Sequence, residues 1–250
     1  MKKFFSIALL FIAITTKAQD VNVLFKEASN LEIQLKDQDA LDKYKQILVI
    51  EPTNIKALVK ATELSCMVGS HLINKNDKRL NYESALAYAQ RAYKVDSTNS
   101  SANYAISVAS ARMTEVETEN KKVAAFARDV KVYADRALAA DPKNGKANFA
   151  VGRWHYEMVV LPVYKKAAVK VLYGGLPNAS LDSAIFYMEK CKTLEPYFAL
   201  NYSFLAKAYR EDNKPTKEIE TLDKLIKLPV RTSDDAVLKA EGQKRREELQ

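Results

Sequence analysis

The sequence predicts an all-α protein built as a stack of antiparallel helix pairs. Apolar and alanine positions recur at steps of three and four through most of the chain, which places them on one helix face. The chain is 48% hydrophobic, yet it contains only six glycines and few alternating β-branched runs, so strands are not expected. Its 250 residues suffice for one mid-sized domain with a real core.

A repeated pattern precedes each predicted helix stop. Ala184, Met188, Cys191 and Pro196 lie at successive steps of four, three and five. The same steps occur at Ala40, Tyr44, Ile47 and Pro52, at Ala85, Ala89, Ala92 and Ser97, and at Val130, Ala134, Ala137 and Pro142. Proline stops a helix because it lacks an N–H and restricts the residue before it. Each stop therefore marks the end of one structural unit.

A second pattern follows each stop, at offsets six, nine, ten and thirteen. After Pro196 these offsets give Tyr202, Leu205, Ala206 and Tyr209, and after Pro142 they give Asn148, Val151, Gly152 and His155. A small residue at the third of these offsets allows two helices to approach closely. The spacing resembles the tetratricopeptide (TPR) helix-turn-helix repeat. The stops are 45, 45 and 54 residues apart instead of 34, so we expect lengthened helices.

The expected elements follow the stops in order. They are Val21–Lys36, Asp39–Ile50, Asn54–Ile73, Tyr82–Val95, Ser100–Thr118, Lys121–Ala140, Gly145–Val160, Leu181–Leu194, Tyr197–Glu211, Pro215–Leu228 and Ala236–Leu249. Polar residues 74–77 are expected to separate the third helix from the fourth. Pro162 interrupts the longest unit, so a kinked or separate short helix is expected over Val163–Tyr173. The charged last helix is expected to cap the solenoid, starting after Thr232–Asp235.

Residues 1–18 have the layout of a secretory signal peptide, with basic Lys2 and Lys3, an apolar run over Phe4–Ile14 and a small residue, Ala18. The run is shorter than the roughly 20 residues of a membrane span. No cysteine lies near the cleavage site, so no lipid anchor is expected. We expect a single repeat domain over 19–250, secreted or periplasmic, with no stable membrane span after signal removal. An uncleaved anchor or a mitochondrial presequence is the alternative.

Composition offers little support for catalysis or nucleic-acid binding. Removing the three lysines of the signal lowers the net charge from +8 to +5, and the remaining basic residues form no stripe. The two histidines and two cysteines form no paired ligand motif, so neither a metal nor another cofactor is expected. His155 is expected to pack its ring, and Cys191 to act as a small apolar residue rather than in a disulfide. We expect a protein that is not an enzyme.

Several short motifs in the last two thirds of the chain occur together. They are Gly152-Arg153-Trp154 ten residues after Asp141-Pro142, Lys165-Lys166, Leu194-Glu195-Pro196, Ala206-Lys207-Ala208-Tyr209-Arg210, and Leu228-Pro229 before Thr232-Ser233-Asp234-Asp235. With them, residues from about Tyr82 to Gln250 resemble the regulator of microtubule dynamics family. The resemblance implies a non-enzymatic, partner-binding protein, linked in the family to microtubules and organelle contacts. Because a secretory signal conflicts with a cytoskeletal role, we expect the fold to carry over rather than that role.

In the TPR repeats that the chain resembles, the first helix of each pair lines the concave face. By their offsets from the stops, the side chains expected to point into this groove are Tyr104, Arg112, Phe149, Arg153, Tyr156, Lys207 and Arg210. Aromatic and arginine side chains most often anchor interfaces. We therefore expect an exported adaptor or scaffold that binds a peptide or protein segment, with acidic groups as one option.

Two alternatives remain open at this stage. The chain could be a small-ligand-binding or enzyme-accessory protein that uses a pocket near the Pro162 insertion. Within the groove, Arg153 could equally well form an intramolecular salt bridge and contact no partner.

Overall fold

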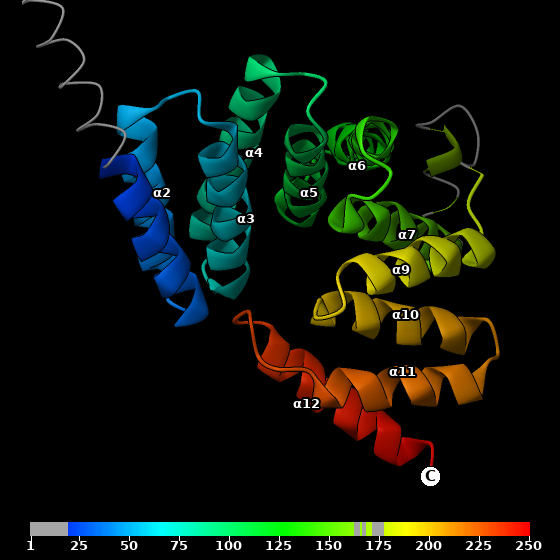
Figure 1. Ribbon diagram of the computed structural model, residues 1–250. Coiled ribbons are helices and arrows are strands. Elements are labelled where there is room, and N and C mark those ends of the chain that lie inside the picture. Colours follow the sequence, from blue (N-terminus) through cyan, green and yellow to red (C-terminus); the bar gives the residue numbers. More distant parts are fainter. Residues whose placement is uncertain (1–19, 163–165, 167–168, 172–177) are drawn as a thin grey trace, which may run out of the picture.

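The computed structural model of the chain describes residues 20–162, 166, 169–171 and 178–250. Every regular element in these ranges is a helix, and successive helices stack into a curved superhelix (Figure 1). The predicted all-α, TPR-like solenoid is therefore confirmed. The predicted signal peptide lies outside the described residues. So does most of the predicted Val163–Tyr173 helix, of which only residues 166 and 169–171 are described, as helical.

The helices form antiparallel pairs in chain order. These are helical residues 20–33 with α2 (Asp37–Ile50), α3 (Ile55–His71) with α4 (Lys75–Val95), α5 (Ser100–Val116) with α6 (Asn120–Ala140), α7 (Gly145–Val160) with α9 (Leu181–Leu194), and α10 (Ala199–Glu211) with α11 (Pro215–Lys227). The terminal helix is α12 (Asp235–Glu248). Helices α3 to α6 have 17 to 21 residues, against 13 in each helix of the last pair, which confirms the lengthening.

One predicted boundary is wrong. Helix α4 begins at Lys75, seven residues before the predicted start at Tyr82. The polar run that was expected to break the helices is a helix start, because the Asn74 side chain accepts hydrogen bonds from the backbone N–H groups of Asn76 and Asp77. Polar residues that interrupt an apolar pattern also satisfy the free donors of a first helical turn.

The same kind of cap starts three of the inner helices. Asn54, Asn99 and Asn144 each lie two residues after a stop, and each accepts a hydrogen bond from the backbone N–H three residues further on. An asparagine cap stabilises a helix by about 1 kcal/mol relative to alanine. These caps set the register of α3, α5 and α7. Helix α10 has no side-chain cap.

Small residues allow the helices of a pair to pack closely. A Cβ atom added to Gly152 would lie 2.9 Å from Met188 Cγ and 3.0 Å from the carbonyl oxygen of Ala184, so α7 and α9 approach each other through this glycine. The small position of the repeat is thus confirmed there. Both cysteines, Cys66 and Cys191, are buried and unpaired, as expected for packed small residues.

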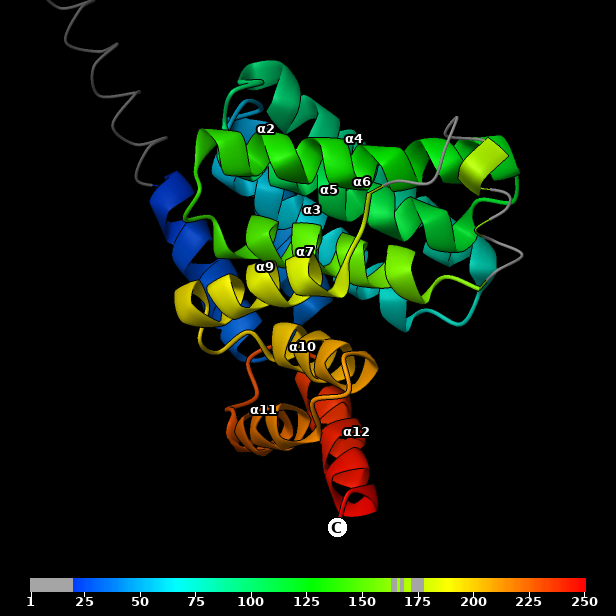
Figure 2. The same ribbon diagram turned by 90° about the vertical axis from the view of Figure 1, so that its right-hand side faces the viewer.

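Helix α12 caps the C-terminal end of the stack. It runs across α10 and α11 (Figure 2), and its Leu238 packs on the apolar cluster that these two helices form. Gly242 lies against Leu225 of α11. Most of its remaining side chains are exposed or half-buried, so the predicted polar cap is confirmed.

Candidate functional site: the concave groove

The inner helices α3, α5, α7 and α10 line the concave face of the superhelix. Two adjoining hollows lie on this face, and Tyr104 of α5 borders both of them. One is a mainly apolar pocket of about 70 Å³, and the other is a polar hollow of about 600 Å³. We refer to them as the apolar pocket and the polar hollow.

The apolar pocket brings four of the predicted groove residues together. Tyr104 and Arg112 reach it from α5, whereas Phe149 and Arg153 reach it from α7. Tyr104 and Phe149 are 7% and 5% exposed, so they form its walls rather than its rim. Burial raises the pKa of Tyr104, which keeps its hydroxyl neutral. The fixed offsets within each repeat therefore place these residues at one site.

Phe204 of α10 is the centre of an aromatic cluster at the edge of this pocket. Its ring makes edge-to-face contacts with Phe149 and Tyr156, at centroid distances of 5.7 and 5.9 Å. Two cations lie near the same ring, with Arg153 Cζ 4.8 Å and Lys207 Nζ 5.1 Å from its centroid. Several predicted residues thus meet at a residue that the repeat offsets did not select.

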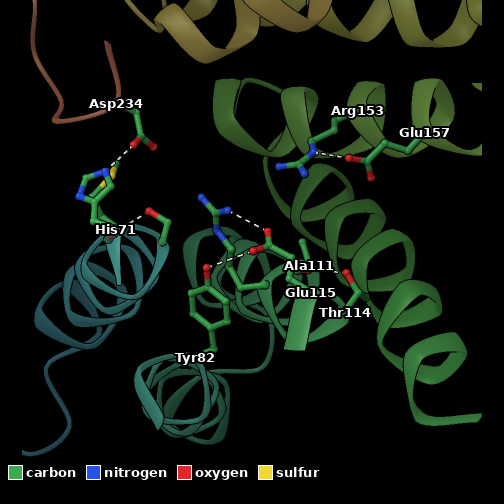
Figure 3. A network of polar contacts seen from close by, with 11 residues as sticks. His71, Tyr82, Ala111, Thr114, Glu115, Arg153, Glu157 and Asp234 are labelled. Carbon is green, nitrogen blue, oxygen red and sulfur yellow. Dashed lines mark hydrogen bonds and ion pairs between the residues drawn. The ribbon is translucent and has the colours of Figure 1, made fainter. Parts of the chain in front are cut away.

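Both arginines of the pocket form ion pairs within their own helices (Figure 3). Arg112 Nη1 lies 2.8 Å from Glu115 Oε1, and Arg153 Nε lies 2.7 Å from Glu157 Oε1. The side chain of Arg153 is 25% exposed and that of Glu157 is 43% exposed. Such i,i+3 and i,i+4 pairs are weak, at about 0.3–0.5 kcal/mol. The intramolecular salt bridge of Arg153 is present, but an incoming carboxylate can replace its partner at low cost.

A chain of alternating charges begins in the polar hollow and continues to the first helix of the stack. Lys146 Nζ of α7 lies 2.5 Å from Glu63 Oε1 of α3, and Lys60 Nζ lies 2.7 Å from Glu32 Oε2. The Tyr44 hydroxyl donates to the other oxygen of Glu32. Burial alone would raise the pKa of Glu63, but Lys146 and Lys60 outweigh it and hold that pKa below its usual value. The chain of charges ties the first repeats to α7.

Arg210 does not reach either hollow. Its Nε donates to Glu218 Oε1 at 2.8 Å, and Arg245 Nε of α12 donates to the same oxygen at the same distance. The Glu218 side chain is 2% exposed. Arg210 therefore holds α10, α11 and α12 together.

His155 is packed, as predicted. It is 8% exposed, and its ring lies 5.2 Å from Trp154 and 6.2 Å from Tyr187 between centroids.

Several groove residues were not among those expected, and Glu63 and Phe204 carried a usable pattern. Glu63 follows Pro52 by eleven residues, the same offset that selects Arg153 after Pro142 and Lys207 after Pro196. Phe204 lies eight residues after Pro196, next to the offset of seven that selects Phe149. Phe198 makes an edge-to-face contact with Phe149, at a centroid distance of 5.0 Å, but it lies in the turn before α10, where no helical pattern could have identified it.

Neither a metal-ligand cluster nor a membrane-spanning helix is found in the described ranges. No group of three His, Cys, Asp or Glu side chains gathers there as metal ligands. None of the described helices is long and apolar enough to cross a bilayer.

A curved array of helix pairs with an aromatic and cationic inner face defines a TPR-like helical-repeat protein. Residues 24–250 match the family model described as Regulator of microtubule dynamics protein 1-3, so the chain belongs to this family. The match extends the resemblance from about Tyr82 back to residue 24.

Relatives and solved structures agree with this assignment. Regulator of microtubule dynamics protein 1 of Mus musculus is 24% identical over 170 residues, which is 68% of this chain and 55% of the relative. The Homo sapiens protein is 22% identical over 68% of this chain and 54% of its own length. The chain thus spans about half the length of these relatives. A thermophilic TPR protein of Thermus thermophilus superimposes with a TM-score of 0.55 at 15% identity, covering 87% of this chain and 98% of that one. That similarity shows the fold alone.

Proposed function

We propose that this chain is an exported, non-enzymatic adaptor or scaffold that binds a segment of another protein in its concave groove. The observation that carries the proposal is the cluster in which Phe204 meets Phe149, Tyr156, Arg153 and Lys207 beside the apolar pocket. Aromatic and arginine side chains around a desolvated pocket are the usual anchors of protein interfaces. Export rests on the signal-like pattern of residues 1–18.

The chemistry of the groove indicates the kind of segment that fits. The apolar pocket, about 70 Å³, has room for roughly five water molecules at ~10–15 Å³ each, close to one branched aliphatic side chain. Arg112 and Arg153 border it, and the carboxylate paired with each is an acid of its own helix. A segment with one aliphatic anchor flanked by carboxylates would fill the pocket and take over both arginines.

Capture of a partner tests the groove. Residues 19–250 serve as bait in an envelope extract of the source organism, with mass spectrometry as readout. We expect one stoichiometric protein partner, lost with Arg153→Glu and kept with Lys121→Glu, a matched charge reversal at an exposed residue of α6. Equal capture by both variants would rule out the groove. An empty eluate from folded bait would favour the small-ligand alternative, whose Pro162 insertion lies mostly outside the described residues.

The export part of the proposal has its own test. Sequencing the N-terminus of the protein recovered from the envelope should find Gln19 as the first residue. Exported protein that still carries Met1 would contradict cleavage. Protein found only in the cytoplasm would contradict export and would make a microtubule role, as in the name of the relatives, the better proposal.

A further inference from the structure

The two ends of the superhelix touch each other. His71, the last residue of α3, has its Nε2 atom 2.6 Å from Asp234 Oδ1, just before α12 (Figure 3). The Ser233 hydroxyl donates to a carboxylate oxygen of Asp37, the first residue of α2. These pairs are 163 and 196 residues apart in the chain. In a repeat array each unit normally contacts only its neighbours, so folding does not require such a junction.

The junction is small and polar. Among the described helices, neither α11 nor α12 packs against α2 or α3. The side chains of His71 and Asp234 are 45% and 31% exposed, so water competes for their contact. Exposed polar pairs of this kind contribute little stability. The two ends can therefore separate without disturbing any apolar core.

The segment before α12, which makes the junction, is held in place by contacts at its own end of the superhelix. Asp235 is 3% exposed, and its carboxylate accepts hydrogen bonds from the backbone N–H groups of Arg231 and Thr232 and from the Thr232 hydroxyl. The Arg231 guanidinium lies over the Tyr197 ring, 4.0 Å from its centroid. These contacts present Ser233 and Asp234 in a fixed position and do not depend on the other end of the arc.

The junction also lies on the rim of the groove. Figure 1 shows the segment before α12 crossing the open side of the arc, toward the ends of α2 and α3. Figure 3 shows the Arg153–Glu157 pair across the same space from the His71–Asp234 pair. Closing the arc at this point limits access to the groove from that side.

We propose that Ser233 and Asp234 form a latch that holds the superhelix closed and opens to admit a protein segment to the groove. The latch is a property of the chain alone, whereas the admission of a partner rests on the proposed function. A segment that binds inside would be retained when the latch closes again.

Distance measurements between the two ends test the latch. Val49 of α2 and Val237 of α12 are 82% and 60% exposed, so V49C and V237C accept spin labels while the native cysteines stay buried. In this labelled background, S233A with D234A should add a longer, broader distance population to the single population of the closed superhelix. The pair D37A with H71A should do the same from the opposite side. E119A, which breaks the remote Lys122–Glu119 pair, is the control and should change nothing. Unchanged distances in both latch variants would overturn the proposal.

Accessibility of the groove tests admission without a known partner. Lys207 lies beside Phe204, so K207C places a thiol at the aromatic cluster. We expect its reaction with a maleimide carrying a long polyethylene glycol chain to be slow relative to N-ethylmaleimide, and to accelerate several-fold when S233A and D234A are added. An unchanged ratio of the two rates would overturn the proposal that the latch controls access to the groove. If both latch tests succeed and the capture experiment fails, the proposed function fails and the latch stands.

Discussion

The guanidinium of Arg153 lies over the ring of Phe204, with Cζ 4.8 Å from the ring centroid, while its Nε donates to Glu157 at 2.7 Å. One side chain thus joins α7 to α10 across the groove and still presents a cation beside the apolar pocket. Both contacts hold Arg153 in one orientation before any partner arrives, which lowers the entropic cost of binding. This arrangement makes the groove the place where mutations should act on binding.

Phe204→Ala should weaken capture of the partner about tenfold or more. The change removes the ring against which Arg153, Lys207 and Phe149 are positioned. Truncation of an aromatic anchor of an interface typically costs about 2 kcal/mol or more, and about 1.4 kcal/mol corresponds to tenfold in affinity. Phe186→Ala is the matched control, since Phe186 is 62% exposed on α9 and outside both hollows. Binding titrations of the captured partner with both variants give the ratio. Equal losses in the two variants would contradict the site.

Arg210→Glu should lower stability rather than abolish binding directly. It places a carboxylate beside Glu218, which is 2% exposed. The expected loss is about 1–2 kcal/mol, because Arg245 still neutralises Glu218 and water screens the half-exposed Arg210. At about 2–4 °C per kcal/mol, the melting temperature should fall by several degrees. Lys224→Glu, an exposed change on α11, should leave it nearly unchanged. If the Arg210→Glu variant melts at the same temperature as the unsubstituted protein, the Arg210–Glu218 pair does not contribute to stability.

Stability at acid pH should depend on Glu218. Burial would raise the pKa of this carboxyl, but hydrogen bonds from Arg245 and Arg210 hold it below the usual value of about 4.3. A depressed folded-state pKa adds stability that is fully present above the unfolded-state pKa and is lost as the pH falls through the folded-state value. Glu218→Gln should therefore be less stable at pH 7, and the difference should shrink below about pH 4. Urea denaturation across this range measures it, and a constant difference down to about pH 3 would contradict the mechanism.

Two glycine substitutions should behave differently. In Gly152→Ala the new Cβ meets the backbone of α9, 3.0 Å from the Ala184 carbonyl oxygen, so we expect a loss of about 1–2 kcal/mol despite the better helix propensity of alanine. In Gly242→Ala the nearest atom is Leu225 Cδ2, the mobile end of a side chain, at 2.9 Å. That variant should be neutral or gain up to about 1 kcal/mol. Thermal unfolding of both separates the cases, and the opposite order would refute close approach at Gly152.

Local features of this fold could be predicted from neighbours in the chain. The three-four spacing identified the helices, and the small position at Gly152 identified a close approach, because both depend on residues a few positions apart. The polar run at residues 74–77 was misread, because the same residue types break one helix and cap the next. Four residues at the apolar pocket could be predicted for the related reason that each repeat exposes the same offsets on its inner helix. Tyr104, Arg112, Phe149 and Arg153 therefore meet at one pocket.

The tertiary structure decided which of these residues line the groove and which contact other parts of the protein. Arg210 has a suitable offset, but α11 brings Glu218 to it and α12 brings Arg245 to the same carboxylate, so Arg210 holds the three helices together. Phe204 became the centre of the cluster because α7 and α10 converge there. The contact between His71 and Asp234 depends on curvature summed over the whole stack of helix pairs. Short-range periodicity determined the helices and their inner faces, whereas the accumulated superhelical twist, a long-range property, decided where the two ends meet.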